Sequence, residues 1–302
     1  MITHAFPAMG GSVEVQLPDG SSADAVRIEA LFATHEHVLS RFLSDSELTA
    51  LNDAISPFHA SPLLFEAVSE ALGWACVTDG VFDPTVIDVL ESSGYDRPFD
   101  SINSPAAVAM MERPASRRAS WRAIELDTDR NVITIPATTR LDLGGIGKGF
   151  TVDRAVASLG PTANAMINAS GDLYAAGDGP DGDGWYVGVQ DPFSLDLDLA
   201  VLNQNDCGVA TSGSIKRKWL IGDARYHHLI DARAGISATS DLLTVTVVAA
   251  TATQSDVLAK TAFLLGARAG VNAVERFDGA ECLAVTCTGD VVTSSGMAEH
   301  YA

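Results

Sequence analysis

The chain has 302 residues, of which 47% are hydrophobic, and a formal net charge of −20. A chain of this length can bury a substantial core, while so acidic a surface repels nucleic acid and anionic membranes, so we expect neither as a partner. An anionic ligand would need a local positive group, which a metal ion, Lys148 or the basic cluster at residues 216–218 could supply.

The sequence also bears on location and redox state. No apolar run approaches the roughly 20 residues that span a bilayer, and the residues after Met1 have neither the basic nor the apolar region of a signal peptide. We therefore expect a cytoplasmic protein without a membrane span. The cysteines show no C-x-x-C spacing, which favours reduced thiols in the core over zinc ligands or disulfides.

The first half of the chain predicts alternating strands and helices. Residues 12–17 alternate between polar and apolar and predict a strand, and residues 23–40 predict a helix. A second helix is expected to start at Ser61-Pro62, because proline is favoured in the first turn, and to end near residue 79. Residues 98–118 predict a surface connection. Residues 121–126 and 132–135 predict a hairpin.

A glycine-rich stretch at residues 141–153 follows, with glycines at positions 144, 145, 147 and 149 around Lys148. These glycines would allow positive φ and a close approach to a ligand. A helix is expected to follow and to stop at Gly160-Pro161. A P-loop would need Ser or Thr after the lysine, and the dinucleotide fingerprint would need glycine at position 150. The stretch alone therefore predicts either a structural turn or an anion-binding loop.

The second half predicts a sheet that is not all parallel. We expect strands at 165–168, 185–189 and 243–250, two strands within 282–294, and a helix at 255–266. Residues 208–219 are small and hydroxyl-rich and predict a turn. Several strands follow one another directly, which favours a mixed, largely antiparallel sheet with packed helices, of the α+β class.

Four predicted turns carry polar groups at strand ends: residues 80–85, 141–149, 208–214 and 226–231. Such turns commonly converge on a site at one edge of a sheet. His227-His228 with Asp231 is the one place that offers a titratable base near an acid. By itself, this segment fits a structural histidine pair as well as a catalytic base.

Taken in order, eight segments resemble the ApbE-like FAD:protein FMN transferases over nearly the whole chain. No single segment is decisive, but their order is specific. The segments are Met9-Gly10-Gly11, Ser46-Glu47-Leu48 with Asn52, Phe82-Asp83-Pro84-Thr85-Val86, residues 142–153, Ser170-Gly171-Asp172, Ala210-Thr211-Ser212-Gly213, residues 227–231, and Ser255-Asp256 with Leu265-Gly266.

The resemblance implies a T-fold-like architecture with two intimately joined lobes, in a single domain over residues 1–302. It also implies an enzyme that binds FAD and Mg²⁺, cleaves the pyrophosphate, and transfers FMN to a Thr or Ser hydroxyl in the flavinylation motif of an acceptor protein. The product is a phosphoester. In phosphoryl transfer of this kind, positioning and charge neutralisation supply most of the rate.

Site residues follow from the same resemblance. His228 is implied as the catalytic base, and Asp256 with the Gly147 carbonyl as the metal ligands. Lys148 is expected either to contact a phosphate or to pair with Asp142 or Asp153. The residues implied to line the flavin nucleotide site are Met9, Phe42, Asn52, Val81, Phe82, Asp83, Gly144, Phe150 and Ile230.

One departure from the family pattern affects the metal site. Lys260 stands four residues after Asp256, where the pattern has a metal-binding Thr, and Thr261 is rotated by about 100° from that position. Lys260 would either supply a fixed positive charge or leave a weaker Mg²⁺ site at Asp256, Gly147 and water. Alternative functions are an FAD pyrophosphatase that releases FMN and AMP, and a non-catalytic FAD-binding protein.

Overall fold

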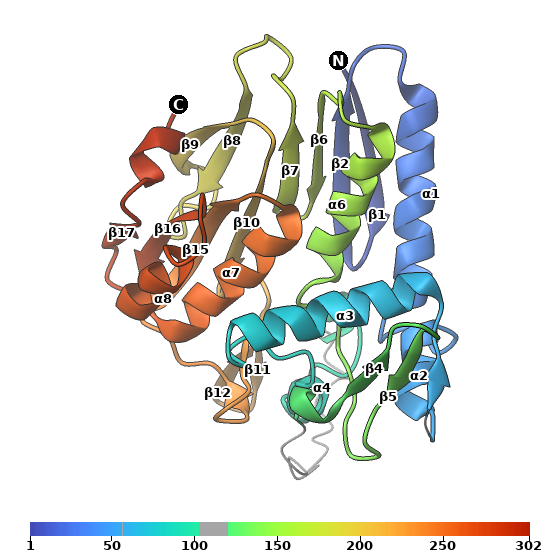
Figure 1. Cartoon of the computed structure of the whole chain (residues 1–302). Helices are drawn as coiled ribbons and strands as arrows, with labels where there is room; N and C mark the ends of the chain where they lie inside the picture. The colour runs from blue at the N-terminus through green and yellow to red at the C-terminus, as the bar shows by residue number, and fades with distance from the viewer. Residues whose placement is uncertain (56, 103–119) are drawn as a thin grey trace. The chain divides into compact units, whose positions relative to one another are not determined.

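The computed structural model describes residues 1–55, 57–102 and 120–302 (Figure 1). The chain divides into two compact units. Unit 1 comprises Met1–Ala33, Lys148–Ile215 and Ser240–Ala302, and unit 2 comprises Thr34–Gly147 and Lys216–Thr239. Within the described ranges, no helix has the length and apolar character needed to cross a bilayer. The four cysteines are free thiols, but the prediction that they lie in the core is wrong for Cys76 and Cys287, which are exposed, and correct for Cys282.

Unit 1 is built on an eight-stranded sheet in the order β1-β2-β6-β7-β10-β15-β16-β17. Every neighbouring pair is antiparallel, which confirms the predicted α+β class with a largely antiparallel sheet. The strands are β1 (Ile2–Ala8), β2 (Gly11–Leu17), β6 (Ala165–Ala169), β7 (Asp172–Ala176), β10 (Cys207–Gly213), β15 (Leu242–Ala249), β16 (Glu281–Thr286) and β17 (Val291–Thr293).

Helices cover one face of this sheet and a β-hairpin covers the other (Figure 1). Successive side chains of a strand point to opposite faces, so each strand contributes to both layers. On the helix side, Ile28 and Val152 pack against Val15; on the hairpin side, Trp185 packs with Val209. The covering elements of unit 1 are α1 (Ser22–Leu39, which continues into unit 2), α6 (Gly147–Leu159), α7 (Ala252–Leu265), α8 (Ala267–Val274), β8 (Trp185–Gln190), β9 (Asp198–Gln204) and η3 (Met297–His300).

The turn predicted at residues 208–219 is wrong. Its first half is the central strand β10, and only the residues between β10 and β11 turn. The small residues serve helix packing instead, because a side chain at Gly208 would overlap the backbone of Thr251 and Ala252 at the start of α7. The side chains of β10 are small because α7 packs closely on this strand.

Unit 2 combines short helices with three small sheets. Ser46 and Ser61 cap α2 and α3: Ser46 Oγ accepts from Thr49 N at 3.0 Å and Ser61 Oγ from Leu64 N at 3.2 Å. The start of α3 at Ser61-Pro62 agrees with the prediction. The elements are α2 (Glu47–Asp53), α3 (Pro62–Val77), α4 (Ile87–Ser92), α5 (Phe99–Ile102), η2 (Trp121–Ala123), β3 (Phe58–His59), β4 (Glu125–Asp127), β5 (Val132–Thr134), β11 (Lys218–Ile221), β12 (Ala224–His227), β13 (Ile230–Asp231) and β14 (Ile236–Ser237).

The predicted hairpin is shorter than expected, because residues 121–123 form the 3-10 turn η2 and only β4 pairs with β5. Of the connection predicted at 98–118, residues 99–102 form α5 and residues 103–118 lie outside the described residues.

Candidate functional site

In unit 2, Asn52 holds the start of the glycine-rich loop. Asn52 Nδ2 donates to the Leu141 carbonyl at 2.9 Å, and Leu141 N donates to Asn52 Oδ1 at 2.7 Å. Leu141 is fully buried, so its backbone groups need these partners. Both ends of the Asn52 amide are therefore engaged by the loop, which makes Asn52 a residue that positions its neighbours.

Asp142 connects the glycine loop to the Phe-Asp-Pro-Thr turn. Its side chain accepts from Gly144 N at 2.9 Å, and its backbone N–H donates to the Pro84 carbonyl at 2.8 Å. Arg41 Nε lies 3.5 Å from the Asp142 carboxylate, and both side chains are nearly buried. Two of the four predicted turns, 80–85 and 141–149, are thus in contact through Pro84 and Asp142; the convergence of all four on one site stays a prediction.

Arg41 organises the aromatic residues beside this loop. Its guanidinium carbon lies 4.1 Å from the centre of the Phe42 ring and 4.7 Å from that of Tyr95, and Nη2 donates to the Tyr95 carbonyl at 2.7 Å. A buried guanidinium that pairs with a carboxylate and stacks on two rings fixes all three neighbours. Arg41 was not among the residues predicted for the site, although Arg41 directly precedes Phe42.

The turn at residues 81–86 is closed by its own side chains. Asp83 accepts from Thr85 N at 2.8 Å and from Thr85 Oγ1 at 2.6 Å. Burial raises the pKa of Asp83, and the hydrogen bonds from Thr85 partly offset the increase. Phe82 is buried and Val81 is half-buried, so the carboxylate stands in partly apolar surroundings.

The histidine pair separates into two roles. His227 Nε2 lies 2.9 Å from the Ala238 carbonyl, and Leu229 N donates to His227 Nδ1 at 3.3 Å. Both ring nitrogens of His227 thus contact backbone, which assigns the proton to Nε2, and burial lowers the pKa of His227. His227 therefore has a structural role, and the catalytic role that the resemblance implies for His228 stays a prediction.

The residues around His228 fix the backbone that follows it. Asp231 accepts from Arg233 N at 2.9 Å and from Ala234 N at 3.0 Å, so its carboxylate closes a turn. Ile230 is buried in an apolar cluster with Leu90, Tyr95 and Trp219. His228 itself is half-buried, between a structural histidine and a packed strand.

In unit 1, the first turns of α6 and α7 meet. Asp153 on α6 accepts from Ala252 N at 2.8 Å, and from Thr253 N at 2.9 Å and Thr253 Oγ1 at 2.5 Å. Burial raises the pKa of Asp153 against the opposing effect of these bonds. A Cβ at Gly149 would lie 2.8 Å from the Ala252 carbonyl oxygen, so only glycine allows this approach.

The predicted positive φ angles in the glycine stretch are wrong. None of the glycines at 144, 145, 147 and 149 has positive φ, because α6 already begins at Gly147 and the preceding turn uses ordinary angles. Gly149 is required for helix packing instead. Gly160 at the end of α6 has φ +91°, which agrees with the predicted stop.

Unit 1 contains two buried lysine–aspartate pairs. Lys148 on α6 pairs with Asp172 on β7, a partner that the expectation of Asp142 or Asp153 did not include. Lys260 pairs with Asp256 one turn earlier on α7, as the i, i+4 spacing predicts. Asp172, which was not predicted as a partner, belongs to the Ser-Gly-Asp segment. It lies near Lys148 because β7 is a strand of the sheet on which α6 packs, although the two residues are distant in the sequence.

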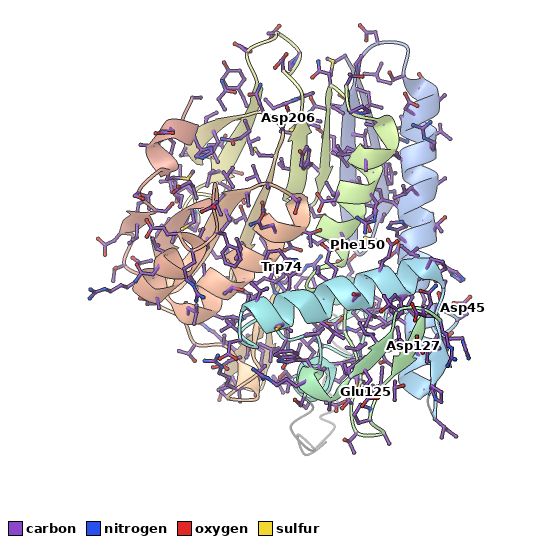
Figure 2. The ribbon with its side chains drawn as sticks, in the orientation of Figure 1. Asp45, Trp74, Glu125, Asp127, Phe150 and Asp206 are labelled. Atoms are coloured by element: carbon purple, nitrogen blue, oxygen red, sulfur yellow. The ribbon has the colours of Figure 1, made fainter. Side chains whose placement is uncertain are left out.

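The two aromatic and apolar candidates of unit 1 lie in or beside the core. Phe150 on α6 is 1% exposed, and the guanidinium carbon of Arg154 lies 4.4 Å from its ring centre (Figure 2). Met9 lies in the turn between β1 and β2 with φ +51° and packs against the helix-side core. Both residues are fixed by their surroundings.

The donors present fit a magnesium site poorly. One oxygen of Asp256 is paired with the Lys260 ammonium, which repels a second cation, and Oδ2 is a single buried oxygen without a hydrogen-bond partner in the described ranges. No group of three or more His, Cys, Asp or Glu side chains that could hold a metal occurs among the residues described.

Comparison with known proteins identifies the family of the chain. The model of the ApbE family matches residues 9–284. The chain belongs to the ApbE family. A relative from Treponema pallidum named "FAD:protein FMN transferase" is 30% identical over 288 residues, with 89% of this chain and 79% of that protein covered. A relative of the same name from Haemophilus influenzae is 27% identical, covering 99% and 90%. The chain is thus an enzyme of this transferase family.

Solved structures of the ApbE family share the fold. The ApbE protein of Thermotoga maritima superposes with a TM-score of 0.86 at 25% identity, covering 100% of this chain and 99% of that one. A flavin transferase ApbE from Vibrio cholerae gives a TM-score of 0.80 at 24% identity, covering 99% and 98%. The fold is therefore that of the ApbE family throughout.

Proposed function

We propose that this chain cleaves FAD at its pyrophosphate and transfers FMN to a Thr or Ser hydroxyl of an acceptor protein that carries a flavinylation motif. The family match over residues 9–284, with relatives named FAD:protein FMN transferase, carries the proposal. The backbone contacts of both His227 ring nitrogens support assigning the proton transfer to His228 rather than to His227.

In the proposed reaction, the acceptor hydroxyl oxygen attacks the phosphorus of the FMN half of FAD. The new P–O bond forms as the P–O bond to AMP breaks, and AMP leaves with the bridging oxygen. A ring nitrogen of His228 takes the hydroxyl proton. Little covalent chemistry is asked of the protein, so the positions of the reactants and the local charge decide the rate.

Within unit 2, we propose that the region organised by Arg41 and Asp142 binds the flavin nucleotide. Arg41 fixes Phe42, and Asp142 ties Gly144 to the turn that carries Phe82 and Asp83. We assign Phe42, Val81, Phe82, Asp83, Gly144 and Ile230 to direct or near contact with the flavin nucleotide, and Asn52 to positioning. For Met9 and Phe150, which belong to unit 1, the flavin-site role stays what the family pattern implies.

The positive charge for phosphoryl transfer has two possible sources. We infer that the Lys260 ammonium supplies it directly; the alternative is a weak Mg²⁺ site at Asp256 that water completes. The pairing of Lys260 with Asp256 favours the lysine, because an ammonium already neutralises the carboxylate that the metal would need.

The test is incubation of the protein with FAD, followed by nucleotide analysis with and without an acceptor protein. A transferase yields AMP and an acceptor with covalently bound, fluorescent FMN, in equal amounts. An FAD pyrophosphatase would release both FMN and AMP without any acceptor. FAD binding with no turnover under any condition would indicate a non-catalytic binding protein and contradict the proposal.

A further inference from the structure

The β11–β12 hairpin and the two residues before it are basic in an acidic protein. Residues 216–227 contain four of the chain's 19 lysine and arginine residues and one aspartate, a formal charge of +3 where the whole chain has −20. Lys216, Lys218 and Arg225 are exposed. These three make no ion pair with any residue in the described ranges.

Register places the basic side chains on one face of this hairpin. Lys218 pairs with His227 and Leu220 with Arg225, so these four residues share a face. Trp219 and Tyr226 form the opposite face, where their rings stack with centres 6.5 Å apart and Trp219 is buried. The outer face therefore combines two cations with Leu220, which is 63% exposed.

This face ends at the candidate catalytic base. His227 is the last residue of β12 and lies opposite Lys218, and His228 follows it directly. A segment that binds along the hairpin would lead to His228 within unit 2 itself. The His227 ring, held by Ala238 and Leu229, fixes the end of this path.

We propose that the outer face of the β11–β12 hairpin binds an acidic segment of the acceptor protein next to the hydroxyl that receives FMN. The proposal rests on the proposed function. An acidic partner is repelled by the rest of this surface and steered to its basic face, which sets both orientation and encounter rate. The exposed Leu220 between the cations suits a peptide with an apolar side chain better than a nucleotide phosphate.

The test uses peptides of glycine, serine and leucine with one threonine, carrying four aspartates, four asparagines or four lysines. Anisotropy measures binding of labelled peptide to FAD-loaded His228→Ala protein, so the readout does not depend on turnover. We expect the aspartate peptide to bind about three- to tenfold more tightly than the asparagine peptide, and the lysine peptide more weakly, with the preference reduced by salt.

The variant Lys218→Glu/Arg225→Glu should abolish or reverse that preference, and Lys218→Gln/Arg225→Gln should remove it with less risk to folding. Arg130→Glu, an exposed charge change on another hairpin, should leave it intact. An unchanged preference in the glutamine variant would overturn the proposal, as would a matching loss of FAD affinity, which would assign the face to the nucleotide. Failure of wild-type protein to transfer FMN would overturn the proposed function separately.

Discussion

Lys260 and Asp256 form an ion pair one helical turn apart on α7, and the Asp256 carboxylate is fully buried. A buried carboxylate needs a compensating charge, which the neighbouring ammonium supplies from within the same helix. The chain thus carries a protein cation at the position where the family pattern has a metal-binding hydroxyl. We infer that this one side chain decides whether the enzyme needs a metal.

Replacement of Lys260 by Thr should create a dependence on Mg²⁺. Removal of one partner of a buried ion pair costs about 3–5 kcal/mol, so Lys260→Thr should lower the melting temperature in EDTA. Added Mg²⁺ should restore part of that loss, because the ion can now neutralise Asp256. Differential scanning calorimetry with EDTA or Mg²⁺ measures both effects.

Lys260→Met is the matched control, because it removes the charge without adding an oxygen donor. It should be destabilised and respond little to Mg²⁺. If Lys260→Thr and the wild type show the same melting response to Mg²⁺ and the same affinity by calorimetric titration, the lysine does not set metal binding.

Protonation of His227 should destabilise the fold at mildly acidic pH. Burial lowers its pKa from the ordinary value of 6.5, so the unfolded state binds a proton that the folded state does not. This contribution to the free energy of unfolding is intact above pH 6.5, falls as the pH drops below 6.5, and levels off below the folded pKa. Urea denaturation between pH 8 and 5 would show the slope.

His227→Gln supplies the comparison, because the amide can still donate to the Ala238 carbonyl but does not titrate. As the pH falls, the free energy of unfolding of the wild type should decrease relative to that of the variant. Parallel curves over the whole range would mean that His227 does not titrate differently on folding.

Gly149→Ala should destabilise the enzyme by about 1–3 kcal/mol, because the new Cβ would lie 2.8 Å from the Ala252 carbonyl oxygen and force α6 away from α7. Gly73→Ala is the matched control in the interior of α3, where a Cβ meets nothing within 4 Å. It should stabilise by about 0.5–1 kcal/mol. Equal shifts of the two melting temperatures would contradict the packing role of Gly149.

Asn52→Ala should cost about 1–3 kcal/mol, because it leaves buried backbone groups of Leu141 without their side-chain partners. The affinity for FAD should fall with it, since the loop that carries Gly144 loses its anchor. The neighbouring change Asp53→Ala, at an exposed position, should stay within about 0.5 kcal/mol of wild type. Unaltered stability of Asn52→Ala in urea would refute the anchoring role.

Local patterns in the sequence predict much of this fold. Three of these patterns each act over a few residues: the alternation at residues 12–17, the helix start at Ser61-Pro62 and the stop at Gly160. The corresponding elements are confirmed. The prediction of a turn at residues 208–219 is wrong for β10, because the small residues of this strand reflect a helix that packs on it from elsewhere in the chain. Sequence shows small side chains but not what lies above them.

The site is less predictable because its contacts are long-range. Asn52 anchors Leu141 across 89 positions, and Lys148 reaches Asp172 only because β7 lies beneath α6. The sequence could not separate His227 from His228 either, since the distinction depends on the Ala238 carbonyl eleven residues away. The order of short segments compensated for this, because it identified the family on which the functional proposal rests.

The most direct test of the central claim is mass spectrometry of an acceptor protein after incubation with FAD and either wild-type enzyme or His228→Ala, with AMP measured in the same samples. We predict one FMN phosphoester per acceptor and one AMP per adduct with wild type. With His228→Ala we predict neither product, although FAD binding measured by flavin fluorescence is retained. Full adduct formation by His228→Ala, or bound FAD without any AMP or adduct in the wild type, would contradict the account.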